Sequence, residues 1–385
     1  MRMTQLKTIA DIQTGPFGSQ LHKEDYVETG TPIVTVEHLG NRVFTEQNLP
    51  RVSDSDKARL IKYTLSTGDI VFSRVGSVDR CSYVDKSHDG WMFSGRCLRV
   101  RPTELVDSLY LYYYFCLEET KQFVRNIAVG ATMPSINTKL LGEVEIALPE
   151  LNNQKRIAAV LSSLDDKIEN NQKLNDNLQQ QAMALYAEMF LNSSDNNVTS
   201  GTLSDIAAIT MGQSPSGSSY NEDGVGEVFY QGRAEFGFRF PKRRLFTTEP
   251  KRMAETGDVL LSVRAPVGDL NVAYERCCIG RGLGAIHSKT GHSSFVLYTM
   301  FALRSQLDVF NGEGTVFGSI NRDALNAIPI DIPPVTEIDQ FEAVAHPIDE
   351  LIRANYEENC RLEAIRDSLL PKLMSGEIDV SAVNL

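Results

Sequence analysis

The sequence contains little cysteine and histidine, and neither is spaced as in a metal site. The six cysteines lie at positions 81, 97, 116, 277, 278 and 360 and form no CxxC pair. The six histidines form no HxxxH or HExxH motif. This pattern argues against a disulfide framework and against a zinc site, and it favours a reducing cytoplasm. We therefore expect no metal and no other cofactor.

Long apolar runs and catalytic motifs are also missing. No stretch approaches the roughly 20 apolar residues of a membrane span, and residues 1–10 lack the apolar core of a signal peptide. The chain has neither a GxxxxGK[ST] phosphate loop nor an NPPY-like motif of adenine methyltransferases. With no catalytic set visible, we expect a protein that is not itself an enzyme.

The net charge of -12 argues against a nucleic-acid binder at first sight. The excess of acidic residues is uneven, however. Segment 1–145 has 17 basic and 18 acidic residues, and segment 201–330 has 13 of each. Segment 146–200 has 4 basic and 7 acidic residues, and segment 331–385 has 4 and 12. The two larger segments are therefore close to neutral, and each can still present a basic face.

Two segments that lie 184 positions apart repeat one apolar pattern. In the first, steps of four and three give Ile157, Leu161, Leu164, Ile168, Asn171, Asn175, Leu178, Ala182, Leu185 and Met189. In the second, the same steps give Phe341, Ala345, Ile348, Ile352, Asn355, Asn359, Leu362, Arg366, Leu369 and Leu373. Both are heptad ladders, which predict two long helices over about 150–190 and 336–374. We expect Pro347 and Pro371 to kink the second helix, with Pro347 in the first turn of its main segment.

Each ladder carries two asparagines at the same rungs. Asparagine at a heptad core position weakens a coiled coil but fixes its register. In an antiparallel pair with a pseudo-two-fold axis, Asn171 would face Asn359 and Asn175 would face Asn355. The alternative is that these amides face solvent at the edge of the ladder.

The rest of the chain is also duplicated. Leu6–Ala10 resembles Leu203–Ala207, and Thr67–Val71 resembles Thr256–Leu260. Short β-branched runs indicate strands between turns, and Asn192–Gly201 has the composition of a linker. The sequence thus predicts an α+β protein with two similar globular domains, separated by two long antiparallel coiled-coil helices and related by an internal pseudo-two-fold. We divide it into a first globular domain (1–145), a first helix with its linker (146–200), a second globular domain (201–330) and a second helix with a tail (331–385).

A tyrosine-rich run near residue 112 has two interpretations. Leu109–Phe123 contains four tyrosines among leucines, which favours a helix packed in the core. The alternative is a platform on which nucleic-acid bases stack.

Three further runs of sequence resemble those of one known family: Thr14–Leu21 with the following Gly30–Ile33, Gly130–Asn137 with Gln154–Ile157, and the C-terminal run Leu369–Ile378. Through them the chain resembles the DNA-specificity subunits of type I restriction–modification systems. The resemblance covers essentially the whole chain. The second copy departs from the first, because Gly15–Gly18 becomes Gly212–Pro215, which suggests that the two domains read different sequences.

The resemblance implies a non-catalytic subunit that selects a bipartite, asymmetric double-stranded DNA target. In that family the subunit binds two methyltransferase (modification) subunits, and restriction subunits complete the complex. The two globular domains would then be target-recognition domains 1 and 2. The paired helices would act as a ruler between the half-sites. A coiled-coil scaffold that bridges two proteins without reading DNA is the alternative.

Bases are read by side chains that reach their edges, and other basic residues hold phosphates. In the first domain the candidates for DNA binding are Ser19, Gln20, His22, Lys23, Arg74, Arg80 and Thr132. In the second they are Ser214, Ser216, Ser218, Gln231, Arg233, Lys242, Arg243, Arg244, Arg264 and Thr315. For each arginine, a solvated surface charge is an equally good interpretation. The run Lys242–Arg244 is the best phosphate candidate, because three adjacent cations repel one another unless an anion is near.

Overall fold

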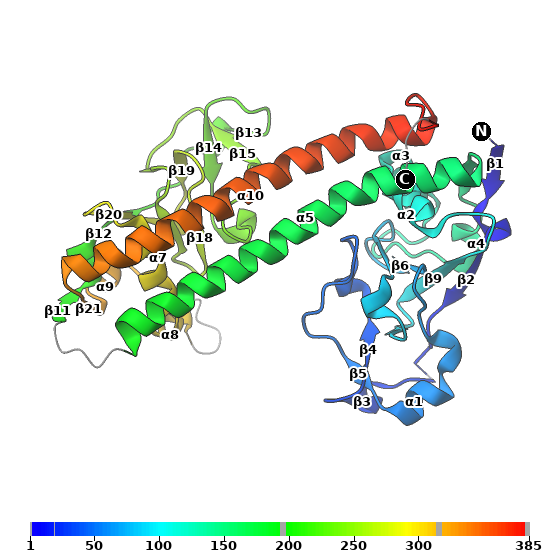
Figure 1. The fold of residues 1–385 in the computed structure, drawn as a ribbon, viewed down its shortest axis with the longest axis horizontal. Helices are drawn as coiled ribbons and strands as arrows, with labels where there is room; N and C mark the ends of the chain where they lie inside the picture. Colours follow the sequence, from blue (N-terminus) through cyan, green and yellow to red (C-terminus); the bar gives the residue numbers. More distant parts are fainter. Residues whose placement is uncertain (1, 19, 193–197, 313–317, 382–385) are drawn as a thin grey trace. The chain divides into compact units, whose positions relative to one another are not determined.

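The computed structural model describes residues 2–18, 20–192, 198–312 and 318–381 (Figure 1). The chain forms two compact units. Unit 1 comprises Met1–Asn170 with Glu358–Leu385, and unit 2 comprises Asn171–Glu357. Each unit therefore contains one globular domain and part of both long helices. Within the described residues, no helix is long and apolar enough to cross a lipid bilayer.

Unit 1 contains two small four-stranded sheets. The first has the order β2-β9-β6-β7, with β2 (Ala10–Thr14), β9 (Cys97–Pro102), β6 (Ile70–Ser73) and β7 (Cys81–Tyr83). The second has the order β3-β5-β4-β8, with β3 (Tyr26–Val27), β5 (Arg51–Val52), β4 (Thr31–Val34) and β8 (Met92–Phe93). A separate antiparallel pair joins β1 (Arg2–Gln5) to β10 (Glu145–Leu148). The core of the first sheet continues into helices α2 (Ser108–Cys116) and α3 (Glu118–Ile127) and into the start of the first long helix.

Unit 2 repeats this topology, with one further strand (β16, Met253–Ala254) in its second sheet. Its first sheet has the order β12-β20-β17-β18, with β12 (Ala207–Met211), β20 (Leu283–Ser288), β17 (Val259–Ser262) and β18 (Leu270–Val272). Its second sheet has the order β13-β15-β14-β19-β16, with β13 (Tyr220–Asn221), β15 (Leu245–Thr247), β14 (Glu227–Tyr230), β19 (Cys277–Ile279) and β16 (Met253–Ala254). The pair β11 (Thr199–Thr202) and β21 (Pro329–Ile332) corresponds to β1 and β10. The duplication that the sequence predicts is thus a duplication of structure.

The two long helices have the predicted extent. Helix α5 spans Leu151–Tyr186 and continues as a π-helical turn to Leu191, and α10 spans Val335–Ser375. The expected place of Pro347 in a first turn is wrong, since α10 begins at Val335 and runs through both Pro347 and Pro371. Both prolines are exposed, so water can satisfy the carbonyl groups that lose an N–H partner. Buried ladder residues on both sides of Pro347 stabilise the helix across it.

Within each unit the parts of α5 and α10 pack antiparallel. In unit 2, the Asn355 Nδ2 donates to the Asn175 Oδ1 at 2.8 Å, and the Asn175 Nδ2 donates to the Ile352 carbonyl at 3.3 Å. In unit 1, the Asn359 Nδ2 donates to the Ile168 carbonyl at 3.4 Å. Asn171, Asn175, Asn355 and Asn359 are all buried, which argues against the solvent-facing alternative. Their role in fixing the register stays a prediction.

Two local expectations need correction. The tyrosine-rich run forms two helices, because the chain turns at Leu117, between α2 and α3. Tyr110, Tyr112 and Tyr113 are buried in the core, so they form no stacking platform for bases. The C-terminal end of the expected linker pairs with β21 as strand β11; residues 193–197 lie outside the described residues.

Candidate nucleic-acid interface

Four loops of unit 1 meet at one end of its first sheet. They are segments 15–18 with Gln20, 74–80, 94–96 and 129–135. Backbone hydrogen bonds join them: the Arg74 N–H donates to the Arg96 carbonyl at 2.8 Å, and the Gly76 N–H donates to the Pro134 carbonyl at 2.8 Å. Loops that a sheet holds in place are common positions for binding residues. We call these four segments loop cluster 1.

Arg74 is oriented within loop cluster 1. Its Nη1 donates to the Gly95 carbonyl at 3.0 Å, and its guanidinium carbon lies 5.3 Å from the centre of the Phe17 ring. Phe17 itself is 52% exposed, which is unusual for such a large apolar side chain. An arginine that is stacked and hydrogen-bonded on one side is held in a fixed direction, as bidentate contact with a guanine edge requires.

Unit 2 builds the same arrangement from its own loops. Loop cluster 2 consists of segments 212–219, 263–268, 280–282 and 318–320. The Val263 N–H donates to the Gly282 carbonyl at 3.0 Å, and the Ala265 N–H donates to the Gly318 carbonyl at 3.0 Å. These bonds correspond one by one to those of loop cluster 1. The correspondence aligns Arg74 with Val263 and Arg96 with Gly282.

The arginines of loop cluster 2 are shifted by one position relative to those of loop cluster 1. Loop cluster 1 has Arg74 and Arg96, besides Arg80, whose guanidinium donates to the Leu39 carbonyl. In loop cluster 2 each arginine occupies the neighbouring position: Arg264 follows Val263, and Arg281 precedes Gly282. Arg96, Arg264 and Arg281 are exposed. Because successive residues of an extended chain point to opposite sides, one fold presents two different patterns of positive charge.

The other candidates of the first domain have varied environments. The Gln20 side-chain oxygen accepts from the Tyr63 hydroxyl at 2.7 Å. Arg80 does not join Arg74, because its guanidinium donates to the Leu39 carbonyl. His22 and Thr132 are exposed. Ser19 and the side chain of Lys23 lie outside what the structure describes.

In the second domain, one group of candidates gathers in loop cluster 2. The Gln231 Nε2 lies 3.0 Å from the Ser214 Oγ, which also accepts from the Arg281 N–H at 3.3 Å. Ser216 and Ser218 are exposed and hydrogen-bonded to each other at 2.8 Å. Thr315 lies outside the described residues.

Three of the four remaining basic candidates of the second domain pair with carboxylates. Arg233 pairs with Asp269, Arg243 with Glu275, and Arg244 with Glu235 at 2.5 Å. The fourth, Lys242, is exposed. The anions beside Arg243 and Arg244 are thus supplied by the protein itself. The contact of the run Lys242–Arg244 with phosphate stays a prediction.

The comparison with protein families covers both loop clusters. The family described as the type I restriction modification DNA specificity domain matches residues 1–180 and 196–357. These two ranges contain the two globular domains, α5 almost to its end and the first half of α10. The chain belongs to this family.

Relatives of the family align with nearly the whole chain. A Methanocaldococcus jannaschii protein, provisionally named the type I restriction enzyme MjaX specificity subunit, is 29% identical over 399 residues and is aligned over 98% of this chain and 93% of its own length. The MjaVIII specificity subunit of the same organism is 23% identical over 405 residues, covering 93% and 92%. The crystal structure of the type I S subunit from M. genitalium has a TM-score of 0.59 at 18% identity, covering 97% and 95%, which shows the shared fold.

As a member of this family, the chain is the DNA-recognising specificity subunit of a type I restriction–modification system and a component of its complex. The subunit is itself non-catalytic. Among the described residues, no group of three or more His, Cys, Asp or Glu side chains is placed to hold a metal ion.

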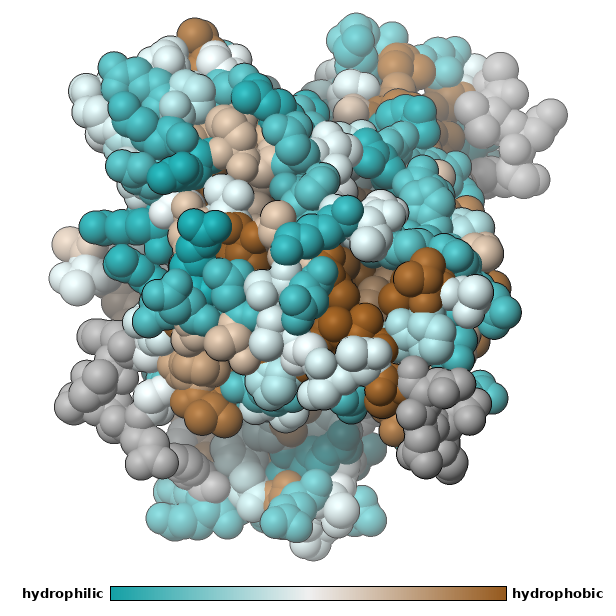
Figure 2. All heavy atoms as spheres, turned by 90° about the vertical axis from the view of Figure 1, so that its left-hand side faces the viewer, coloured by the Kyte–Doolittle hydropathy of each residue, from teal (hydrophilic) through white to brown (hydrophobic). Residues whose placement is uncertain are grey.

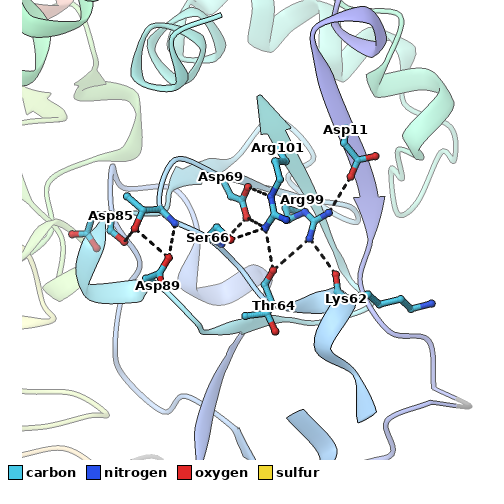
Figure 3. A network of polar contacts seen from close by, with 10 residues as sticks. Asp11, Lys62, Thr64, Ser66, Asp69, Asp85, Asp89, Arg99 and Arg101 are labelled. Carbon is cyan, nitrogen blue, oxygen red and sulfur yellow. Dashed lines mark hydrogen bonds and ion pairs between the residues drawn. The ribbon is translucent and has the colours of Figure 1, made fainter. Parts of the chain in front are cut away.

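The arginines of strand β9 were not among the DNA candidates, and the structure gives them internal partners (Figure 3). Arg101 contacts the buried carboxylate of Asp69 through two nitrogens, at 2.7 and 2.6 Å, and Arg99 contacts Asp11 at 3.0 Å. Unit 2 repeats the first contact with His287 and Asp258, which lie 2.6 Å apart. These residues stabilise the specificity subunit's sheets.

Sequence reasoning missed Arg96, Arg281 and Phe17. Arg96 and Arg281 are isolated residues in turns, and only the hydrogen bonds between loops bring them beside the predicted residues; Phe17 lies in the loop after β2. Sequence reasoning also missed Arg42 and Arg239, whose side chains lie against the long helices. Their carboxylate partners lie more than 100 positions away in the sequence, so no local motif could reveal them.

Proposed function

We propose that this specificity subunit reads an asymmetric, bipartite double-stranded DNA target, with loop cluster 1 reading one half-site and loop cluster 2 reading the other. The observation that carries the proposal is that the two loop clusters have matching backbone hydrogen bonds but place their arginines at positions that differ by one residue. One fold with two charge patterns suits two different half-sites. The division of the chain into two target-recognition domains and two helical segments belongs to the same proposal, as does the helical ruler. The alternative, a coiled-coil scaffold that bridges two proteins without reading DNA, does not explain why the family recognises DNA.

We further propose that two methyltransferase subunits dock on the long helices and that restriction subunits join through them. Several apolar side chains on the outer faces of these helices support this docking. The exposed ones are Leu174 and Met183 on α5, and Val344, Leu351 and Ile365 on α10. Figure 2 views unit 2 from the end at which α10 begins, and apolar side chains gather there in a band between hydrophilic ones. Apolar patches with polar rims mark protein-binding surfaces.

A cytoplasmic location also belongs to the proposal. All six cysteines of the chain are free thiols in the described structure, and five of them are buried or half-buried. Free thiols suit a reducing compartment.

Modified-base sequencing tests the proposed function. We expect cells that express this chain with its neighbouring methyltransferase to carry a methylated bipartite motif that is absent from cells lacking the chain. Both half-sites and the spacer would be read from one experiment. A stable complex with the methyltransferase and no new methylated motif would contradict the proposal.

Substitution of single arginines should alter one half-site at a time. We expect Arg74→Ala to relax one half-site and Arg264→Ala to relax the other, since a lost bidentate base contact costs roughly 1–3 kcal/mol, or about 5- to 150-fold in discrimination. The measurement is the same sequencing, scored base by base. Lys86→Ala, which changes an exposed cation outside loop cluster 1, is the control and should leave both half-sites intact. Relaxation of the same half-site by both arginine substitutions would argue against one cluster per half-site.

A further inference from the structure

One arginine in each unit joins the recognition domain to a long helix. The Arg42 carbonyl accepts from the Tyr83 N–H at 2.7 Å, and the Arg239 carbonyl accepts from the Val272 N–H at 2.8 Å. Tyr83 and Val272 hold the same place in strands β7 and β18. Arg42 and Arg239 are therefore equivalent residues of the structural repeat, although the loops that carry them share no sequence motif.

In unit 1, the Arg42 side chain lies against α5. Its guanidinium donates to the Asp166 carboxylate and, at 3.3 Å, to the Ser162 carbonyl. Its Nε lies 3.3 Å from a Glu169 carboxylate oxygen. The arginine side chain is 18% exposed and Asp166 is 55% exposed, so this contact lies at the surface.

In unit 2, the Arg239 side chain is more deeply buried, at 4% exposure. It donates to the Asp349 carboxylate of α10 at 2.7 Å and to the Gln179 side-chain oxygen of α5 at 3.0 Å. The Tyr298 hydroxyl donates to the same Asp349 oxygen at 2.9 Å. Burial raises the pKa of Tyr298, so its hydroxyl keeps the proton that it donates.

The difference between the two contacts follows from one position of the heptad ladder. Asp165 and Asp349 are repeat-related and hold the same place on α5 and α10. In unit 1, Arg366 of α10 pairs with Asp165 at 2.7 Å. The residue that corresponds to Arg366 in unit 2 is the buried Ala182. Asp349 therefore takes its cation from the recognition domain, whereas Arg42 binds the next carboxylates along α5.

Each arginine also connects the helix to a reading loop. Strand β7 begins directly after segment 74–80 of loop cluster 1, and β18 begins one residue beyond segment 263–268 of loop cluster 2. The backbone of the arginine is bonded to that strand, and its side chain is bonded to the helix. A single residue thus spans the distance between the long helix and the loop that carries Arg74 or Arg264.

We propose that Arg42 and Arg239 are positioning residues that fix each reading loop on its long helix, and thereby hold the spacing between the two DNA half-sites to one value. This inference rests on the proposed function. A base pair adds roughly 3.4 Å to the DNA. A loop that can shift by a few ångströms on its helix would accept a spacer that is one base pair longer or shorter.

The test is modified-base sequencing with the full chain and its methyltransferase, comparing wild type with Arg42→Met. We expect both half-site sequences to be unchanged, while methylation at spacers one base pair longer or shorter rises by up to about fivefold. Arg42→Lys should give an intermediate rise, because a lysine can reach one carboxylate but lacks the planar fork of arginine. Arg51→Met, which removes a bond to the Gly30 carbonyl within β-structure, is the matched control and should keep the wild-type spacer.

A second variant removes the same contacts from the helix. Asp166→Asn combined with Glu169→Gln changes only partly exposed carboxylates, and the fold should tolerate it even if Arg42→Met does not fold. It should widen the spacer in the same way. A single wild-type spacer in this double variant, or loss of one half-site sequence, would overturn the positioning role. Absence of any methylated motif with the wild-type chain would instead refute the proposed function.

Discussion

Replacing Arg239 by methionine should lower the free energy of unfolding of unit 2 by about 3–5 kcal/mol. The substitution removes a side chain that is 4% exposed and leaves the Asp349 carboxylate, itself 16% exposed, without its cation. A largely buried carboxylate without a cation retains its desolvation cost without the compensating attraction. Because the chain has two units, the loss should be measured by hydrogen exchange of strands β17, β18 and β20 in increasing urea, which reports on unit 2 alone.

Two controls separate the charge from the packing. Arg42→Met in unit 1 should cost only about 0–1 kcal/mol, since its partner Asp166 is 55% exposed and water screens the pair. Adding Asp349→Leu to Arg239→Met should recover most of the loss, because the double variant buries no unpaired charge. If Arg42→Met and Arg239→Met lowered the free energy of unfolding equally, the two contacts would not differ in the way that the replacement of Arg366 by Ala182 at the repeat-related position explains.

The long helices could be predicted from the sequence because their pattern is local. The apolar ladder recurs at every third or fourth residue, and a helix of that length must bury such a stripe whatever it packs against. The prediction for Pro347 was wrong because it, too, rested on a local rule. A local rule forbids proline inside a helix, but Phe341 and Ile352 are fully buried on either side of Pro347 and stabilise the continuous helix.

The candidate interface was less predictable, because it depends on contacts between distant segments. Arg74 and Arg264 could be selected as basic residues, and the similarity of Thr67–Val71 to Thr256–Leu260 matches Arg74 with Val263. The neighbours of these arginines could not be predicted, because only hydrogen bonds bring residues 96 and 282 beside them. Arg243 and Arg244 illustrate the opposite error. Three adjacent cations indicate an anion nearby, but a sequence does not say whether that anion is a phosphate or, as here, the carboxylates of Glu275 and Glu235.

Phe341→Ala should lower the free energy of unfolding of unit 2 by about 3–5 kcal/mol. Phe341 is fully buried, and its ring centre lies 5.5 Å from that of Tyr186, 5.5 Å from that of Phe190 and 5.7 Å from that of Tyr298. These rings come from α5, from the π-helical turn that continues it, and from α7 (Ser293–Ala302), so Phe341 packs the recognition domain onto both long helices. Rigid aromatic neighbours cannot collapse into the space that a removed ring leaves, and the cavity cost is added to the lost burial.

The repeat itself supplies the control for Phe341. The corresponding residue of unit 1 is Ile157, which is 2% exposed. Phe341→Ile should therefore cost clearly less than Phe341→Ala, because isoleucine fills part of the site and suits the same ladder position. Urea unfolding followed by hydrogen exchange of α7 checks both values.

In cells, Phe341→Ala should weaken methylation of the complete bipartite motif, because an unfolded unit 2 presents no loop cluster 2. Full methylation despite the predicted loss of stability would mean that bound methyltransferase or DNA stabilises unit 2 by mass action. Adding that partner to the unfolding experiment would detect this stabilisation directly.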